Sequence, residues 1–416
     1  MAKLTVRDLD VRGQRIFLRV DYNVPMEEKD GKMVITDSTR IVETLPTLKL
    51  LIEKGGKLIL TAHLGRPKGK REATMSLQPV AVKLSELLGK PAAFVDDCIG
   101  EKVEQAVAAM KDGDVVLLEN VRYYNEEEKN DPVFAEKLAK VADVYVNDAF
   151  GAAHRAHAST EGVARAVARR GGKCAAGLLM ERELKFLGDE LEKPARPFVV
   201  ILGGAKVSDK IKVIDRLLEK ANTILIGGAM AYTFKLAHGE KVGKSLVEPD
   251  HKQTALDAEA KARKLKVDFE LPEDVVVATP VETGKLNKKG KPVLDFTNIR
   301  TVSGDIPDGA EGFGVGEKTA ARYAEIIKGA KTILWNGPLG MFEDPRFAAS
   351  TNIVAQAVAD ATQKGAKSII GGGDSVKALK KAKLGDKVTF MSTGGGASLE
   401  FLEGAVLPGV AALSEK

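Results

Sequence analysis

The sequence predicts an α/β fold built from two doubly wound domains, each with a parallel sheet. Short runs of aliphatic and β-branched residues recur along the whole chain. A polar or glycine-containing turn and then an amphipathic stretch of helical period follow most of them. Strands that alternate with helices in this way form parallel sheets covered on both faces. A length of 416 residues exceeds what one hydrophobic core usually supports, so two domains are expected.

The apolar runs are the predicted strands of these sheets. In the first half of the chain they lie at residues 16–20, 57–60, 115–118 and 144–146. In the second half they lie at residues 198–202, 223–226, 275–278, 332–335, 368–370 and 388–391. Their shortness and their Val, Ile and Leu content fit strands buried on both faces.

A leucine-rich helix is predicted between the two domains. Its leucines recur at helical spacing, at Leu178, Leu179, Leu184, Leu187 and Leu191. Pro194 and Pro197 then end the helix before the next strand. We therefore expect an N-terminal domain over residues 1–175, a connecting helix and hinge over 176–197, and a C-terminal domain over 198–401, both domains Rossmann-like.

Composition argues against several classes of protein. The net charge of +5 is modest, basic and acidic residues are interleaved, and aromatic residues make up 5% of the chain, so no nucleic-acid partner is expected. Cys98 and Cys174 are the two cysteines, without zinc-ligand spacing, which favours a reducing compartment. No apolar stretch approaches the roughly 18 residues of a membrane helix, and no signal-peptide pattern opens the chain. We expect a cytoplasmic protein with no membrane partner.

Polar and basic side chains follow the predicted strands of the first half. Ligands of open parallel sheets bind at the carboxyl ends of the strands. The residues found there are Asp21, Asn23, His63, Arg66, Arg122 and Arg155. Guanidinium groups suit phosphate and carboxylate, and the Asp and Asn side chains could hold hydroxyl groups. Any one arginine alone would more often be a surface ion-pair partner than part of a binding site. The coincidence of four strand ends favours a site for an anion.

Glycines follow the predicted strands of the second half. They lie at Gly203 and Gly204, Gly227 and Gly228, Gly337, Gly371 to Gly373, and Gly394 to Gly396. Glycine allows backbone N–H groups to approach phosphates closely, and a following helix adds its positive dipole end. Lys206 could reach a transferring phosphoryl group, and Asp374 could hold Mg²⁺ together with phosphate oxygens. The alternative is that these glycines only allow tight packing of strands against helices.

Three further segments carry no such argument. Residues 239–245 resemble a phosphate-binding loop but have one residue too few between the glycines. Residues 312–316 lack the spacing of a dinucleotide fingerprint. The basic segment 285–291 is predicted to be a solvated hairpin or loop.

Taken in order, these strand-end segments resemble the phosphoglycerate kinase family. The resemblance is carried by Arg19-Val20-Asp21-Tyr22-Asn23-Val24-Pro25 and by residues 63–67 and 148–157. In the second half it is carried by residues 203–210, 335–343, 371–375 and 393–400. It covers nearly the whole chain, and a set of motifs in this order is highly specific.

The resemblance implies a set of site residues. For 3-phosphoglycerate or 1,3-bisphosphoglycerate it implies Asp21, Asn23, Arg40, His63, Arg66, Arg122 and Arg155, with Arg40 coming from the match at residues 38–41 alone. For ATP or ADP it implies Gly203, Lys206, Lys210, Gly227, Gly228, Phe313, Asn336, Glu343, Gly372, Gly373, Asp374 and Ser375. The transition-state roles fall to Arg40, Lys206, Gly372, Gly373, Gly395 and Gly396.

The resemblance also implies a cofactor, an oligomeric state and a tail. Mg²⁺ would arrive as Mg-ATP or Mg-ADP with Asp374 as its protein ligand. The protein would be a monomer, and residues 402–416 would pack back on the N-terminal domain. Two departures from the family pattern stand out. Ser375 replaces a common Thr but keeps the hydroxyl, and residues 312–316 replace Gly-Leu-Asp-x-Gly near the nucleoside.

The expected reaction is direct in-line phosphoryl transfer between ATP and a carboxylate. An ionised carboxylate needs no general base, which fits a sequence that offers cations and backbone amides. A nicotinamide-dependent dehydrogenase is a rival, but no correctly spaced Gly-x-Gly-x-x-Gly follows a strand. A non-catalytic protein that binds a phosphorylated metabolite is a second rival. The glycine-rich strand ends of the second half argue against it.

Overall fold

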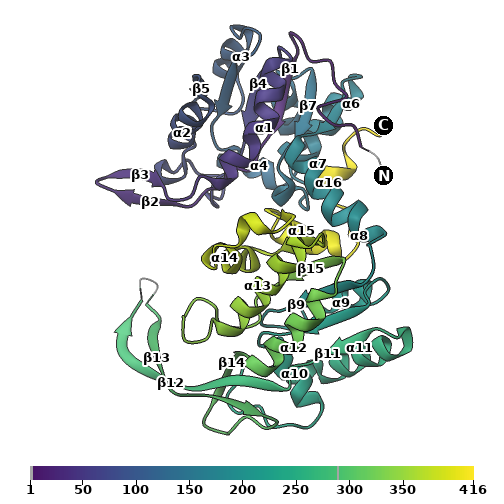
Figure 1. Cartoon of the computed structure of the whole chain (residues 1–416). Helices are drawn as coiled ribbons and strands as arrows, with labels where there is room; N and C mark the ends of the chain where they lie inside the picture. Colours follow the sequence, from purple (N-terminus) through teal and green to yellow (C-terminus); the bar gives the residue numbers. More distant parts are fainter. Residues whose placement is uncertain (1–2, 288–289) are drawn as a thin grey trace. The chain divides into compact units, whose positions relative to one another are not determined.

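The computed structural model describes residues 3–287 and 290–416, which form two compact units (Figure 1). The N-terminal unit runs to Lys185 and also includes Gly396–Phe401 and Ala405–Lys416. The C-terminal unit comprises Phe186–Gly395 and Leu402–Gly404. These limits come from contacts within each unit, whereas the domain boundaries proposed above come from sequence pattern and stay predictions.

The N-terminal unit is built on a six-stranded parallel sheet with the strand order β5-β6-β4-β1-β7-β8. Its strands are β1 (Arg15–Arg19), β4 (Lys57–Thr61), β5 (Ala92–Val95), β6 (Val115–Leu118), β7 (Val144–Asn147) and β8 (Cys174–Ala176). A two-stranded hairpin, β2 (Met26–Lys29) and β3 (Lys32–Ile35), lies outside this sheet. The central strands are almost fully buried, as their apolar sequence predicts.

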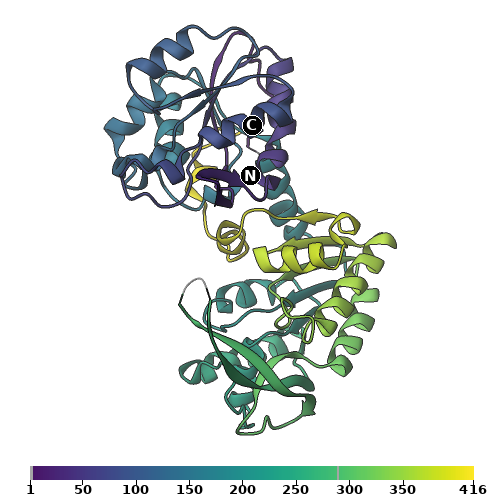
Figure 2. The same ribbon diagram turned by 90° about the vertical axis from the view of Figure 1, so that its left-hand side faces the viewer.

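Helices lie on both faces of this sheet, as the two views show (Figures 1 and 2). They are α1 (Thr39–Glu53), α2 (Gln78–Leu88), α3 (Glu101–Ala108), α4 (Asn125–Glu128), α5 (Pro132–Ala139), α6 (Val163–Arg169), α7 (Leu178–Leu184) and α16 (Pro408–Ala411). Local sequence sets their ends. Asp131 accepts a hydrogen bond of 2.8 Å from Phe134 N at the start of α5, where Pro132 occupies the first helical position. Gly89 ends α2 in the left-handed conformation.

The C-terminal unit has a second six-stranded parallel sheet, ordered β11-β10-β9-β15-β16-β17. Its strands are β9 (Phe198–Leu202), β10 (Thr223–Ile226), β11 (Asp268–Glu270), β15 (Thr332–Asn336), β16 (Lys367–Gly371) and β17 (Phe390–Met391). Its helices are α8 (Glu190–Glu192), α9 (Ile211–Leu217), α10 (Met230–Ala237), α11 (Lys252–Leu265), α12 (Glu317–Lys328), α13 (Ala349–Gln363) and α14 (Gly373–Lys381), and α15 (Gly396–Leu402) follows in the chain. Trp335 is fully buried in this core, and its indole N–H donates to Gly337 O at 2.8 Å.

The predicted fold class of two parallel-sheet α/β domains is confirmed, with one strand in a different sheet. The run at 275–278 lies in β12 (Asp274–Leu286), which pairs antiparallel with β13 (Pro292–Ser303) and β14 (Glu311–Val315). Figure 2 shows β12 and β13 as a long twisted ribbon. An apolar run alone does not reveal the pairing direction. Lys288 and Lys289 of the predicted basic loop lie outside the described residues.

Three strands of the two parallel sheets were not among the predicted apolar runs, namely β5, β8 and β11. Each is short and lies at an edge of its sheet, and β5 and β11 are also partly exposed, whereas β8 is buried. The predicted connecting helix is also interrupted, because a π-helical turn at Lys185–Asp189 separates α7 from α8. Gly188 lies in this turn, and glycine weakens a helix interior.

Candidate functional site

The register of each parallel sheet brings the predicted site segments to one edge. In the N-terminal unit, Arg19 at the end of β1 pairs with Thr61 of β4 and Asn147 of β7. In the C-terminal unit, Asn336 at the end of β15 pairs with Leu202 of β9 and Gly371 of β16. The loops that leave these strands therefore start side by side within each unit.

Asp21, Asn23 and Arg40 come together at the edge of the N-terminal sheet. Arg40, in the first turn of α1, donates from Nη1 to Asp21 Oδ2. The Oδ1 atom of Asp21 accepts from Asn23 N at 3.3 Å. Asn23 Oδ1 in turn accepts from Gly65 N at 2.9 Å, which ties the loop after β1 to the loop after β4. Arg40 was expected from resemblance alone, and the structure places it against Asp21.

Arg122 is anchored to the same loop. Its Nη1 donates to Gly65 O at 3.0 Å, and its Nε lies 3.5 Å from Glu128 Oε1. Burial, the largest influence, lowers the pKa of Arg122, and the charge of Glu128 opposes this. Asn120 supports the loop by donating from Nδ2 to Leu64 O at 2.7 Å. One face of the Arg122 guanidinium is therefore held by protein groups.

Arg66 and Arg155 are exposed in the segments that follow β4 and β7, the two strands that flank β1. Neither forms an ion pair with a carboxylate within residues 3–287 and 290–416. An exposed arginine on an ordinary surface often has such a partner, and these two are instead open to an external anion.

His63 is 7% exposed and its Nδ1 lies 2.9 Å from Nη2 of Arg19. Burial is the largest influence that holds its pKa well below the usual range, and the charges of Arg19 and Arg122 add to it. Burial also lowers the pKa of the neighbouring His157 to about 4. The imidazoles of this edge are therefore neutral at physiological pH.

Arg19 is the residue that the strand-end reasoning missed. It is 1% exposed and lies inside the apolar run at residues 16–20. Arginine is seldom fully buried unless it is paired. A charged residue in an otherwise apolar strand was the available signal.

In the C-terminal unit, Lys210 and Asn336 are in direct contact. Lys210 Nζ donates to Asn336 Oδ1, while the buried Nδ2 of Asn336 has no partner in the described part of the chain. Burial lowers the pKa of Lys210 to about 8. Lys206 is exposed in the loop after β9. Lys206 and Lys210 therefore follow β9, and the amide donor of Asn336 lies at the end of the adjacent strand β15. Two cationic groups and a free N–H donor are suited to bind phosphate oxygens.

Two groups among the predicted glycines differ in what an added side chain would meet. A Cβ atom at Gly203 would lie 2.0 Å from Pro338 O, one at Gly227 would lie 2.4 Å from a Leu339 methyl group, and one at Gly228 would lie 2.6 Å from Gly204 N. These three glycines are required for packing, which is the alternative left open by the sequence.

The second group consists of Gly373, Gly395 and Gly396, where a Cβ atom would meet nothing within 4 Å. Gly372 has φ +82° and a Cβ there would lie 3.5 Å from Asn336 Oδ1. Gly372 is the N-cap of α14 and Gly396 begins α15. Open backbone at a helix N-terminus is suited to phosphate.

Asp374 and Ser375 follow in the first turn of α14. Asp374 is exposed and its Oδ1 lies 2.9 Å from Lys377 Nζ. Ser375 is buried and its Oγ accepts from Gly337 N at 2.7 Å. Among the residues that the structure describes, no cluster of three or more His, Cys, Asp or Glu side chains could hold a metal by itself. A single carboxylate fits Mg²⁺ that is held mainly by phosphate oxygens and water.

Glu343 and Phe313 lie elsewhere in the same unit. Glu343 is exposed, and its carbonyl oxygen accepts from Lys381 Nζ at 2.7 Å. Phe313 belongs to an aromatic cluster with Phe296 and Phe347, whose ring centroids are each 4.8 Å from its own.

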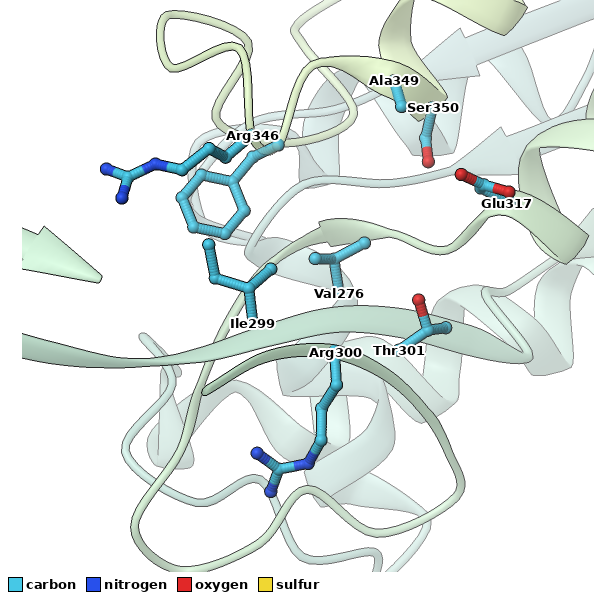
Figure 3. A pocket seen from close by; sticks show the side chains of 9 residues that line it. Val276, Ile299, Arg300, Thr301, Glu317, Arg346, Ala349 and Ser350 are labelled. Atoms are coloured by element: carbon cyan, nitrogen blue, oxygen red, sulfur yellow. The ribbon is translucent and has the colours of Figure 1, made fainter. Parts of the chain in front are cut away.

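A pocket of about 190 Å³ adjoins this aromatic cluster (Figure 3). Its lining is Val276, Ile299, Arg300, Thr301, Glu317, Arg346, Phe347, Ala349 and Ser350. None of the predicted site residues lines it.

Comparison with known proteins gives consistent results. The family model described as phosphoglycerate kinase matches residues 6–405. A phosphoglycerate kinase of Akkermansia muciniphila is 54% identical over 416 residues, covering 100% of this chain and 99% of that protein. One of Chlorobium limicola is 50% identical over 415 residues, covering 100% of each.

Solved structures agree with these sequences. The structure of phosphoglycerate kinase from Coxiella burnetii matches with a TM-score of 0.83 and 38% identity, covering 99% of this chain and 98% of that one. That of the Pyrococcus horikoshii enzyme matches with a TM-score of 0.78 and 34% identity over the same shares. In the described residues no helix has the length and apolar character to cross a membrane.

Proposed function

This chain belongs to the phosphoglycerate kinase family and transfers a phosphoryl group reversibly between ATP and the carboxylate of 3-phosphoglycerate, and we propose which of its residues do so. The reaction, a step of glycolysis and of carbon fixation, gives 1,3-bisphosphoglycerate and ADP. In our proposal the N-terminal unit binds 3-phosphoglycerate and the C-terminal unit binds the nucleotide.

The observation that supports the acceptor site is the pair of exposed arginines, Arg66 and Arg155, that have no carboxylate partner among the described residues. In our proposal Arg66 and Arg155 bind the phosphate of 3-phosphoglycerate, and Arg122 joins them. Asp21 and Asn23 would orient the end of 3-phosphoglycerate that carries the hydroxyl and carboxylate groups. His63 would donate a hydrogen bond to the same ligand. Bidentate arginine contacts supply both charge and geometry for such a ligand.

The open amides of the α14 N-terminus support the nucleotide site. There Gly372 and Gly373 would bind phosphate oxygens, with Lys206, Lys210 and Asn336 beside them. The nucleoside end would be held by Gly227, Gly228, Phe313 and Glu343, with Gly203 and Ser375 keeping the loops in place. Asp374 would hold Mg²⁺, which neutralises phosphate charge when it is bound.

Positioning and charge stabilisation would account for catalysis. The acceptor carboxylate is ionised at neutral pH, so it attacks in line without a general base and without a phosphoenzyme. Arg40 and Lys206 would stabilise the charge that spreads over the transferring group. The amides of Gly372, Gly373, Gly395 and Gly396 would contribute hydrogen bonds to the same oxygens.

We also propose that the protein acts as a monomer in the cytoplasm. Its cysteines, Cys98 and Cys174, are both free and buried, which suits a reducing compartment. Sedimentation at several protein concentrations would test the monomer, since a concentration-dependent rise in mass would contradict it.

Acceptor-dependent turnover tests the proposed function most directly. ADP formation from Mg-ATP is measured with and without 3-phosphoglycerate, and any acyl phosphate is trapped with hydroxylamine. We expect ADP and hydroxamate only when the acceptor is present. ADP formation that does not depend on 3-phosphoglycerate would be hydrolysis of ATP and would contradict the proposal.

A further inference from the structure

A chain of buried polar side chains lies behind His63 in the N-terminal unit. It runs from Glu127 in α4 through Ser159 to Arg19 at the end of β1. Glu127 and Ser159 are completely buried, and Arg19 is 1% exposed. Burying a carboxylate and a guanidinium is unfavourable unless each is well paired, so this arrangement calls for an explanation.

The donor and the acceptor of each hydrogen bond between these buried side chains can be assigned. Ser159 N lies 2.9 Å from Glu127 Oε2, and Ser159 Oγ lies 2.6 Å from Glu127 Oε1. An ionised carboxylate only accepts, so the hydroxyl hydrogen of Ser159 points to Glu127. A lone pair of Oγ is then left to accept the Nε–H of Arg19 at 2.8 Å. Burial raises the pKa of Glu127, and the charge of Arg19 opposes that rise.

The remaining hydrogen bonds of Arg19 lead to His63. Its Nη1 donates to Val20 O, and its Nη2 lies 2.9 Å from His63 Nδ1. A guanidinium stays protonated and has no acceptor atom, so Nδ1 of His63 must accept. A neutral imidazole whose Nδ1 accepts carries its hydrogen on Nε2.

The surroundings keep His63 neutral. Burial disfavours its protonation, and so do the charges of Arg19, Arg122 and Arg40 and any charge on His157. In the described part of the chain Nε2 has no hydrogen-bond partner, and it is not among the polar atoms sealed from solvent. The donor on Nε2 is thus left for a ligand.

We propose that Arg19, held by Ser159 and Glu127, is a positioning residue that fixes His63 as a neutral Nε2–H donor toward the anionic acceptor. This inference rests on the proposed function, which places 3-phosphoglycerate beside His63. The other neutral tautomer would present an Nε2 lone pair to an anionic oxygen and repel it. Fixing the tautomer keeps the donor in place over the whole neutral pH range.

The tautomer is measured directly in the ligand-free protein. The ring nitrogens of the 5 histidines are recorded by ¹⁵N NMR between about pH 5 and 8, and His63→Gln assigns the signal of interest. We expect an unprotonated Nδ1 and a protonated Nε2 throughout. A hydrogen on Nδ1, or titration near the ordinary histidine pKa, would overturn the inference.

Substitution of Arg19 tests the link to the acceptor. Arg19→Lys keeps the charge but cannot span Ser159, Val20 and His63 together. We expect the tautomer signal of His63 to change and KM for 3-phosphoglycerate to rise about tenfold or more, with kcat at saturation changing less. Ser159→Ala is a milder variant that keeps both charges, and we expect a smaller shift in the same direction.

Arg15→Lys is the matched control. Arg15 begins the same strand and pairs with Asp143 at 2.6 Å, away from His63. We expect no change in the tautomer or in KM. If Arg19→Lys and Ser159→Ala fold and also leave KM unchanged, the positioning role is overturned.

The two proposals fail in distinguishable ways. If the wild-type protein binds 3-phosphoglycerate but His63 carries its hydrogen on Nδ1, the inference is wrong and the proposed function stands. If the tautomer is as expected but Arg66→Ala and Arg155→Ala leave acceptor binding unchanged, the acceptor site is wrongly assigned. The role given to Arg19 then fails with it.

Discussion

At the scale of single residues, Lys206 and Arg155 separate the two halves of the proposed site. Lys206 is exposed beside the proposed phosphate-binding glycines, and its charge would act on the transferring group. We expect Lys206→Ala to lower kcat by about 100-fold or more while the Kd for 3-phosphoglycerate stays nearly the same. Steady-state kinetics and calorimetry with the acceptor alone provide the two numbers.

Arg155→Ala is the converse variant. Loss of one charged hydrogen-bond donor should raise KM for 3-phosphoglycerate about tenfold or more and leave nucleotide affinity unchanged. If Lys206→Ala instead abolished acceptor binding with normal turnover at saturation, the assignment of ligands to the two units would be wrong.

Lys210 gives a prediction about pH. Burial lowers its pKa to about 8, so the fraction that carries charge falls as the pH rises through that value. We expect the affinity for ADP to weaken above about pH 8 and Lys210→Arg to remove most of this dependence, since arginine stays charged. Calorimetric titrations with ADP on both sides of that pH measure it. Lys331→Arg, an exposed lysine before β15, is the control and should retain the wild-type profile.

At the scale of elements, the N-terminus of α7 is bound by a buried carboxylate. Asp148 Oδ1 accepts from Leu179 N at 2.9 Å and Met180 N at 3.1 Å. Burial, the largest influence, nevertheless raises its pKa to about 6. Because the folded protein then holds this proton more tightly than the unfolded chain, the stability contributed by Asp148 falls as the pH rises from about 4 to about 6.

Asp148→Asn tests this sign. The amide oxygen can still accept from α7, but the side chain no longer ionises. We therefore expect the variant to gain stability relative to the wild type between about pH 4 and 7, by about 1–3 kcal/mol. Urea unfolding at both pH values measures the difference. A relative loss over the same range would mean that the dipole of α7 outweighs burial.

Two of the glycines that follow the strands, Gly203 and Gly373, should respond differently to substitution by alanine. Gly203→Ala would place a Cβ 2.0 Å from Pro338 O, so we expect a loss of about 1–3 kcal/mol in the free energy of unfolding. Gly373→Ala meets nothing within 4 Å and lies in the first turn of α14, so stability should not fall. We expect it instead to raise KM for ATP. Chemical unfolding and nucleotide kinetics on both variants distinguish the packing role from the binding role.

At the scale of the whole molecule, the sequence predicted the two-sheet fold and the strand ends because both depend on local runs and their order. It did not reveal that 275–278 pairs antiparallel in β12, because pairing is a non-local property. Nor did it reveal the role of Arg19, whose partners Ser159 and Glu127 are far away in sequence. It also left open which glycines pack and which face open space, and Gly203 and Gly373 differ only in what surrounds them.

The reaction itself leads to a prediction about the whole chain. In-line transfer requires the acceptor carboxylate and the γ-phosphoryl group in contact, whereas the proposed acceptor and nucleotide residues belong to different units. We therefore expect closure about the segment 176–197 when both ligands are bound, which would also exclude water from a hydrolysable product.

Small-angle scattering is recorded with 3-phosphoglycerate, with a non-hydrolysable ATP analogue, and with both. We expect the radius of gyration to decrease clearly only with both ligands. Arg155→Ala at sub-saturating acceptor is the control, because weaker acceptor binding should shift closure to higher concentration without changing its extent. An unchanged radius with both sites saturated would rule out closure and require the ligands to meet in some other way.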